Sequence, residues 1–266
     1  MMAGRFWPLF ALVAARTQAI NRPKVRATIP ADGRALACAF GVLGGFDKCV
    51  QVLAERRVVS RRAARKVMHM GAGPLYLLCW PMFSASPSAK RWAAVGPLAL
   101  TAKAFLAGAG LVDDPKTVAS MSRSGDRREL LRGPTLYGAV FVAATLCCWR
   151  ELGGVLALVA LCAGDGMAEV VGASPLGAAS PRVPWCRRKS LAGSAAFFLS
   201  TLGAGAAFGL GFARVGWWAP LPARALVAGV AKVAAVSALV ESLDTGDWDN
   251  PLIFLAAAAT AKRVFP

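Results

Sequence analysis

Eight apolar runs, separated by polar loops, constrain this chain more than any other feature of its sequence. The approximate runs are 36–54, 69–84, 92–112, 136–149, 153–172, 194–213, 224–243 and 251–263. A helix that spans the hydrocarbon core of a membrane needs about 20 mostly apolar residues. The apolar fraction of 56% and the mean hydropathy of +0.51 point the same way. The sequence therefore predicts an all-α, polytopic transmembrane helix bundle with seven or eight spans, since two of the runs are short.

Basic residues are distributed unequally between the two ends of such a bundle. If all eight runs cross the membrane, four loops lie at one face: 55–68, 113–135, 173–193 and 244–250. The first three of these loops contain fifteen Lys and Arg residues, whereas the opposite face and the C-terminal tail contain seven. An excess of this kind marks the cytosolic or stromal side. We therefore attribute the net charge of +17 to orientation and not to nucleic-acid binding, which uses a basic face on a soluble fold.

Residues 1–34 have the composition of a targeting leader. They contain six basic residues, and their first acidic residue is Asp32. Arg-rich, acid-poor leaders are typical of organelle transit peptides, and the apolar run 6–15 adds signal-peptide character. The alternative is a short tail with an interfacial helix. The remainder, 35–266, is predicted to be a single membrane domain.

The cysteines and the histidine limit the metal and redox chemistry. The chain has seven cysteines, an odd number, without any C-x-x-C spacing, and most lie within apolar runs. We expect free thiols, not disulfides or zinc ligands. His69 is the only histidine, which argues against a histidine-rich metal site.

The stretch 161–194 concentrates residue types that bind phosphate and metal. These are Gly164, Asp165, Gly166, Glu169, Arg188, Lys189, Gly193 and Ser194. Asp165 and Glu169 are four residues apart, so that both carboxylates share one face of a helix. Paired carboxylates, glycines and a basic cluster suit Mg²⁺ and a polyphosphate. The alternative for Gly164-Asp165-Gly166 is an ordinary turn.

The other loops at the same predicted face add further charged groups. Lys66 precedes His69 at the start of a run, where it could hold phosphate or simply act as a basic anchor beside a structural histidine. Arg123 and Arg128 lie in a Ser- and Gly-containing loop that could bind phosphate or form a solvated amphipathic helix. The last loop contains Glu241 and Asp249, which could serve a metal ion or a general base, or balance the nearby arginines.

Together these loops resemble the phytol kinase family of plants and algae, which belongs with farnesol and dolichol kinases among the membrane polyprenol kinases. The matching stretches are Arg65-Lys66 with His69, SMSRSGDRRELLRGP at 120–134, CAGDGMAEVVG at 162–172, RKSLAGS at 188–194, and Glu241 with Asp249-Asn250. The resemblance covers about residues 60–255 and implies a kinase that uses CTP, or alternatively UTP. It implies phosphorylation of phytol to phytyl phosphate in a plastid membrane, in support of tocopherol synthesis. The endoplasmic reticulum membrane is the alternative location.

The resemblance also implies roles for individual residues. Asp165 would bind Mg²⁺, with Glu169 as a second ligand or water-holder. Lys189, supported by Arg188, would bind the nucleotide phosphates, which the Gly193 and Ser194 amides would cap at a helix N-terminus. Further phosphate contacts would come from Arg123, Arg127 and Arg128. A carboxylate of Asp249 or Glu241 would act as general base, with His69 as the second choice.

Other functions remain as alternatives. The acceptor could be farnesol, geranylgeraniol or a dolichol-like alcohol, because tail length is recognised by apolar spans. A CTP-using phospholipid cytidylyltransferase would need similar charged groups but would release pyrophosphate. A transporter or channel is disfavoured, because the polar residues gather at one face and no inverted repeat is evident.

Overall fold

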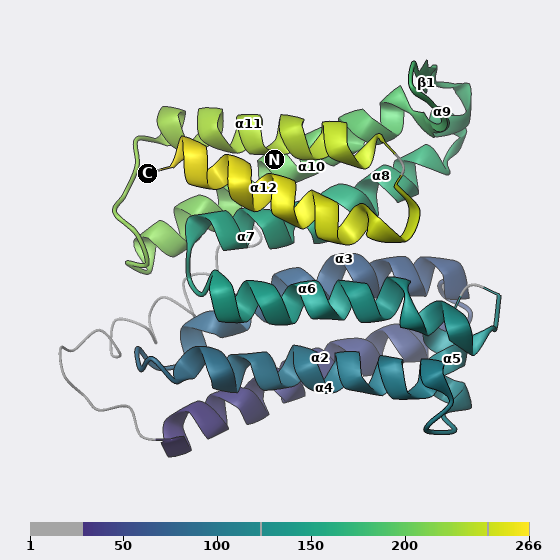
Figure 1. Ribbon diagram of the computed structural model, residues 1–266, viewed down its shortest axis with the longest axis horizontal. Coiled ribbons are helices and arrows are strands. Elements are labelled where there is room, and N and C mark those ends of the chain that lie inside the picture. The colour runs from purple at the N-terminus through teal and green to yellow at the C-terminus, as the bar shows by residue number, and fades with distance from the viewer. Residues whose placement is uncertain (1–28, 123, 244, 266) are drawn as a thin grey trace.

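The chain forms two layers of helices that run roughly along one common direction (Figure 1). The computed structural model describes residues 29–122, 124–243 and 245–265. One layer contains four long helices: α2 (Ile29–Glu55), α3 (Arg61–Cys79), α4 (Ala89–Ala109) and α6 (Gly133–Cys147). Shorter elements connect them: η1 (Trp80–Met82), α5 (Pro115–Met121) and η2 (Arg127–Leu131).

The second layer contains the C-terminal half of the described chain. Its helical segments are α7 (Leu152–Val159), η3 (Ala160–Gly164), α8 (Asp165–Gly172), α10 (Leu191–Arg214), α11 (Ala223–Glu241) and α12 (Asp249–Val264). The connections contain α9 (Pro175–Ala179), the antiparallel strands β1 (Arg182–Val183) and β2 (Cys186–Ser190), and η4 (Gly246–Trp248). Contacts of α3 with α8, and of α6 with α12, join the two layers.

The predicted all-α membrane bundle is confirmed, and every one of the eight apolar runs lies largely in a helix. Six helical segments are long and apolar enough to cross a membrane: Ala31–Glu55, Ala89–Ala109, Arg127–Cys147, Leu152–Gly172, Leu191–Arg214 and Ala223–Glu241. The other two are α3, which begins with a basic stretch, and α12, which has 16 residues. The run predicted at 69–84 begins earlier, at Arg61, where Ser60 caps the helix by accepting a hydrogen bond from the Ala63 amide.

The centre of the bundle is the span formed by α7, η3 and α8. Every side chain from Val155 to Cys162 is fully buried, and 67% of this span lies inside the protein, compared with 11% for α2. Asp165 follows directly after the π-helical segment η3. A π-helical turn rotates the residues that follow it and occurs often at functional sites. Asp165 therefore lies on the most buried span of the described bundle.

Most of the predicted leader lies outside the described residues, but its last six residues belong to α2. Asp32 is buried there, and its carboxylate accepts hydrogen bonds from the Ser84 amide and hydroxyl at 2.7 and 2.9 Å. Residues 29–34 of the predicted leader are thus part of the folded bundle.

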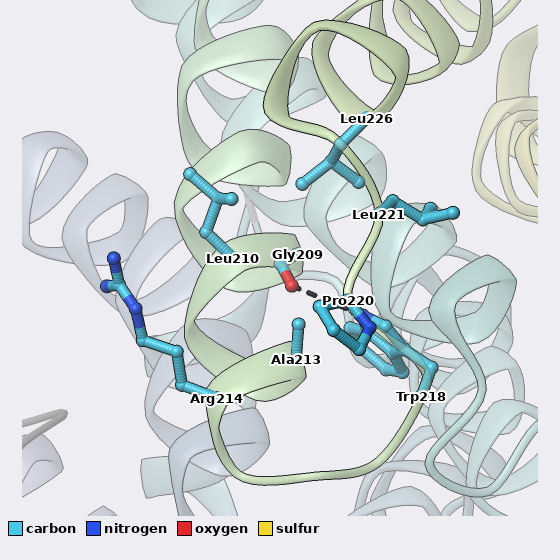
Figure 2. Close-up of a pocket in the computed structure, with 8 residues that line it drawn as sticks. All are labelled: Gly209, Leu210, Ala213, Arg214, Trp218, Pro220, Leu221 and Leu226. Atoms are coloured by element: carbon cyan, nitrogen blue, oxygen red, sulfur yellow. Dashed lines mark hydrogen bonds between the residues drawn. The ribbon is translucent and has the colours of Figure 1, made fainter.

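The two ends of the bundle differ in character. At the right-hand end of Figure 1 lie α5, α9 and β1, together with the loops that carry most of the charged residues. The opposite end includes the turn between α10 and α11, where a pocket of about 320 Å³ is lined mainly by apolar side chains and by Arg214 (Figure 2). This pocket shares no residue with the charged end, so we treat the two as separate.

Candidate active site

Contacts between distant loops bring the predicted polar face together. Arg65 Nη1 donates a 2.7 Å hydrogen bond to the main-chain oxygen of Ser122, which joins α3 to the loop after α4. Arg132 Nη1 lies 3.2 Å from Asp247 Oδ2, which joins α6 to the segment before α12. The charged loops therefore converge at one end of the bundle, as the alternation of apolar runs predicts.

Two consecutive turns of α3 and α8 form the first cluster of charged residues. Lys66 makes an ion pair with Glu169, and His69 Nε2 lies 3.3 Å from Asp165 Oδ2. The His69–Asp165 pair is within ion-pair distance but is not aligned as a hydrogen bond. Asp165 and Glu169 are four residues apart on α8, and Lys66 and His69 are three apart on α3. Either spacing places two side chains on one face of a helix, so the two pairs can face each other. Each carboxylate predicted as a metal ligand therefore has its own basic partner.

Tyr137 of α6 supports His69 from the side. Its hydroxyl donates to the main-chain oxygen of His69 at 3.1 Å and lies 3.2 Å from Cys162 Sγ. The Tyr137 and His69 ring centroids are 4.6 Å apart. Gly73 makes this packing possible, since a Cβ there would lie 2.2 Å from Cys162 Sγ. The imidazole is thus held between a half-buried tyrosine and the Asp165 carboxylate.

Lys189 is the centre of the second cluster. It stands near the end of β2, makes an ion pair with Glu241 at the end of α11, and lies 3.9 Å from Asp249 Oδ2 at the start of α12. Burial opposes its charge, but Glu241 outweighs this effect, with smaller contributions from Asp249 and Asp165, so the pKa of Lys189 is raised. The influence of Asp165 shows that the two clusters belong to one electrostatic site.

The β1–β2 hairpin fixes Lys189 and the start of α10. The hairpin is held against α11 by Trp185, whose Nε1 donates to Ser242 Oγ at 3.0 Å. The first three amides of α10 all donate to protein acceptors: Leu191 N to Pro181 O at 2.9 Å, Ala192 N to Ser180 Oγ at 3.0 Å, and Gly193 N to Ser190 Oγ at 3.2 Å. The Gly193 amide, predicted to cap a phosphate, thus already has an acceptor within the protein.

Comparison with known proteins places this site in a family. The chain is 34% identical over 234 residues to a protein of Glycine max named "Probable phytol kinase 1, chloroplastic", which covers 85% of this chain and 75% of that relative. It is 31% identical over 239 residues to "Phytol kinase 1, chloroplastic" of Arabidopsis thaliana, covering 86% and 76%. The chain belongs to the phytol kinase family.

The same comparison includes a second named activity. "Farnesol kinase, chloroplastic" of Arabidopsis thaliana is 32% identical over 239 residues, covering 86% of this chain and 75% of that relative. No family model and no solved structure matches the chain. The resemblance to the phytol kinase family read from the sequence is thus confirmed by these relatives.

Within this phytol kinase family member, the predicted site residues fall into three groups. Lys66, His69, Asp165, Glu169, Lys189 and Asp249 all take part in the two clusters. Arg128 and Arg188 are exposed, on η2 and β2. Arg123 lies outside the described residues.

The two glycines beside Asp165 serve helix packing. Residues 160–172 are continuous helix, so the alternative of an ordinary turn at Gly164-Asp165-Gly166 is wrong. A Cβ at Gly164 would lie 2.4 Å from Thr201 Oγ1, and a Cβ at Gly166 would lie 2.2 Å from Met70 Cγ. These glycines let α10 and α3 approach Asp165 from two sides, a packing role beside the phosphate and metal binding predicted for their stretch.

The donor set fits a magnesium ion that is shared with a substrate. Among the described residues, no group of three or more His, Cys, Asp or Glu side chains is close enough to enclose a metal. Mg²⁺ in phosphoryl-transfer sites is commonly held by one or two carboxylates plus phosphate oxygens and waters. The two clusters contain four carboxylates and two ammonium groups, which leaves an excess of negative charge. Asp165 is the residue that would hold the ion.

Sequence reasoning missed Tyr137, Cys162 and the hydroxyls of Thr201 and Ser237. All four belong to apolar runs. Tyr137, Cys162 and Thr201 become significant through neighbours on other helices, and Ser237 through a buried hydroxyl without a partner among the described residues. The rarity of tyrosine was the available signal, because the chain has two and one lies three residues after the Arg-Gly-Pro that ends the loop motif.

Proposed function

We propose that this protein transfers the γ-phosphoryl group of CTP to the primary hydroxyl of an isoprenoid alcohol, with phytol as the substrate. The observation that carries the proposal is Lys189 among three carboxylates at one end of a membrane bundle. Lys189 can contact nucleotide phosphates, and the surplus carboxylates can hold a cation that balances their charge, near the hydroxyl of a membrane-embedded alcohol. The names of the relatives support the alcohol and the kinase reaction.

The chain would supply mainly position and charge. Phosphoryl transfer needs little covalent help from protein groups, so catalysis depends on holding the reactants in line and stabilising charge. Lys189 and Lys66 would exchange part of their contact with Glu241 and Glu169 for phosphate oxygens. Asp165 would hold Mg²⁺, which would supply positive charge to balance the nucleotide phosphates. A carboxylate beside Lys189 would accept the proton of the alcohol.

The names of the relatives, together with the apolar helices, also support a membrane location. The three relatives are named chloroplastic, and six segments of the described chain can cross a membrane. We place the protein in a chloroplast membrane, where phytyl phosphate would feed tocopherol synthesis. The charged end would then face the compartment that holds CTP.

Isolated membranes that contain the expressed protein test the proposal directly. With phytol, Mg²⁺ and CTP, we expect phytyl phosphate and CDP, and a chelator of divalent cations should abolish both products. Release of pyrophosphate would instead identify a cytidylyltransferase. Absence of any phosphorylated alcohol with CTP, UTP, ATP or GTP would refute the kinase proposal.

Farnesol is the second candidate acceptor, because one relative is named a farnesol kinase. A competition assay with phytol, farnesol, geranylgeraniol and a dolichol at equal concentration ranks them by kcat/KM. We expect phytol to rank first, and a higher kcat/KM for farnesol would reassign the substrate without changing the reaction class.

A further inference from the structure

Four buried polar side-chain atoms on α10 and α11 lack a hydrogen-bond partner among the described residues. They are Ser194 Oγ, Thr201 Oγ1, Ser237 Oγ and Glu241 Oε2. Buried polar groups are nearly always paired, so an unpaired set on two adjacent helices calls for a missing partner. The side chains of Thr201, Ser237 and Glu241 are almost completely buried.

The packing of α10 against α11 shows which of these atoms lie at the same level. A Cβ at Gly209 would lie 3.1 Å from Leu226 Cδ1, and a Cβ at Gly205 would lie 2.8 Å from Val230 Cγ1. Gly209 and Leu226 lie at the end of this antiparallel pair that leads into the turn between α10 and α11, and both line the pocket in Figure 2. Moving back four residues along α10, from Gly209 to Gly205, therefore corresponds to moving forward four residues along α11, from Leu226 to Val230.

Continued toward the charged end, this register places Ser194 opposite Glu241. The contact between Lys189 and Glu241 supports this register independently, because Lys189 lies just before α10. Ser237 lies one turn deeper on α11, and Thr201 lies two turns deeper than Ser194 on α10. The unpaired atoms of Ser194 and Glu241 are thus the pair nearest to Lys189.

The two atoms have complementary hydrogen-bonding needs. Glu241 Oε1 is occupied by Lys189, whereas Oε2 requires a donor. The hydroxyl of Ser194 has no acceptor. An alcohol group satisfies both, because its O–H donates to a carboxylate and its oxygen accepts from a serine. Half-exposed Leu191, Leu239 and Leu243 lie at the same end of these helices and provide apolar surface for a hydrocarbon chain.

We propose that Ser194 and Glu241 bind the hydroxyl of the acceptor alcohol and that Glu241 Oε2 takes its proton; this rests on the proposed kinase function. The alcohol oxygen forms a bond to the γ-phosphorus as the bond from that phosphorus to the bridging oxygen breaks. The electron pair of the broken bond leaves with the nucleoside diphosphate, and the hydroxyl proton passes to Glu241.

Glu241 suits this role better than the other two candidate bases. Asp249 uses Oδ1 to accept hydrogen bonds from the Thr245 amide and hydroxyl at 2.7 and 2.6 Å, which fixes the turn before α12. His69 directs Nε2 toward Asp165. Glu241 alone among the three presents a buried carboxylate oxygen without a partner in the described part of the chain.

Binding of the alcohol without nucleotide provides the first test. A diazirine-bearing phytol analogue is cross-linked to the full chain in detergent micelles, with phytol or phytyl methyl ether as competitor. Because the ether cannot donate to Glu241, we expect phytol to compete about tenfold better. In Ser194→Ala, competition by phytol and by the ether should both weaken about threefold, because both oxygens accept from Ser194. In the matched control Ser200→Ala neither should change, since Ser200 already donates to the Ala196 main-chain oxygen.

Kinetics provide the second test. Ser194→Ala should raise the KM for the alcohol and leave the KM for CTP unchanged, and Glu241→Gln should lower kcat at least 100-fold. Equal competition by phytol and its ether in the wild type would overturn the subsite, as would a Ser194→Ala effect confined to the KM for CTP. If the wild type forms no phosphorylated alcohol, the kinase proposal fails, while the competition result still decides whether the hydroxyl is bound here.

Discussion

At the scale of single residues, Asp165 is the group on which the proposed chemistry depends most. It is the one carboxylate on the buried central helix that approaches both clusters, through its contact with His69 and its influence on Lys189. Replacement by asparagine preserves shape but removes the charge that would hold a cation. We expect Asp165→Asn to lower kcat at least about 100-fold. Phytyl phosphate formation in membranes measures this, with the exposed Asp113→Asn as control; activity close to that of the wild type would remove Asp165 from the metal role.

Lys189 leads to a different kinetic expectation. Its ammonium group is placed to exchange carboxylate contacts for phosphate contacts, so its loss should weaken nucleotide binding more than alcohol binding. We expect Lys189→Ala to raise the KM for CTP about tenfold or more. Initial rates at varied CTP and saturating phytol measure the effect. An unchanged KM for CTP would assign Lys189 to holding α11 and α12 together through Glu241 and Asp249.

At the scale of helices, much of the second layer was predictable from hydropathy alone. The run predicted at 153–172 corresponds to 152–172, and the run at 194–213 corresponds to Leu191–Arg214. The start of α3 was missed because its first turns are basic. The pairing of Lys66 with Glu169 and the hydrogen bond from Arg65 to Ser122 show why these turns are tolerated. The contact of His69 with Asp165 depends on the relative rotation of two helices, about which single-helix periodicity carries no information.

The approach of α3 to α8 can be tested at one glycine. Gly166 faces Met70, so Gly166→Ala should push the helices apart and reduce the free energy of unfolding by about 1–3 kcal/mol. Gly172→Ala is the matched control on the same helix, because the nearest atom to its new Cβ would be Ser190 Oγ at 3.8 Å. Thermal unfolding in detergent compares the two. Equal unfolding temperatures of the two variants would mean that α3 can move away from α8 without loss of stability.

The short helix α5 gives a pH-dependent prediction. The Thr117 side chain and amide donate to Asp114, and with Lys103 at 3.3 Å they lower the pKa of Asp114 from 3.8 to about 2. Since the folded-state pKa is depressed, the stabilisation is present above about pH 4 and is lost as the pH falls toward 2. Asp114→Asn should therefore lower the unfolding temperature at pH 5, and its difference from the wild type should shrink between pH 4 and pH 2. A difference that is constant over this range would contradict the assignment.

At the scale of the whole molecule, the two ends of the bundle are built for different tasks. The charged end is held by ion pairs that a nucleotide could replace, whereas the opposite end is closed by Arg150. Its Nη2 donates to the main-chain oxygens of Trp80 and Phe83 at 3.0 and 2.6 Å, and its guanidinium lies 5.1 and 5.2 Å from the ring centroids of Trp149 and Trp217. Burial lowers the pKa of Arg150 to about 10, which still leaves it charged at neutral pH. This residue therefore joins three interhelical connections by contacts that no substrate needs to displace.

Because the two ends are separate, a substitution at the end that Arg150 closes should change stability without changing catalysis. Arg150→Met removes two hydrogen bonds from a charged donor and should reduce the free energy of unfolding by about 2 kcal/mol. The backbone here is left-handed, with φ 57°, and the substitution leaves its strain unchanged because both residues carry a Cβ. The KM values for CTP and phytol should stay within about twofold of the wild type at a temperature where the variant is folded. Arg224→Met, at an exposed position of the same end, should change stability by less than about 0.5 kcal/mol. Because the candidate site lies at the far end of helices that Arg150 helps to align, a large rise in either KM would show that alignment of the whole bundle, and not the local clusters alone, sets the geometry for phosphoryl transfer.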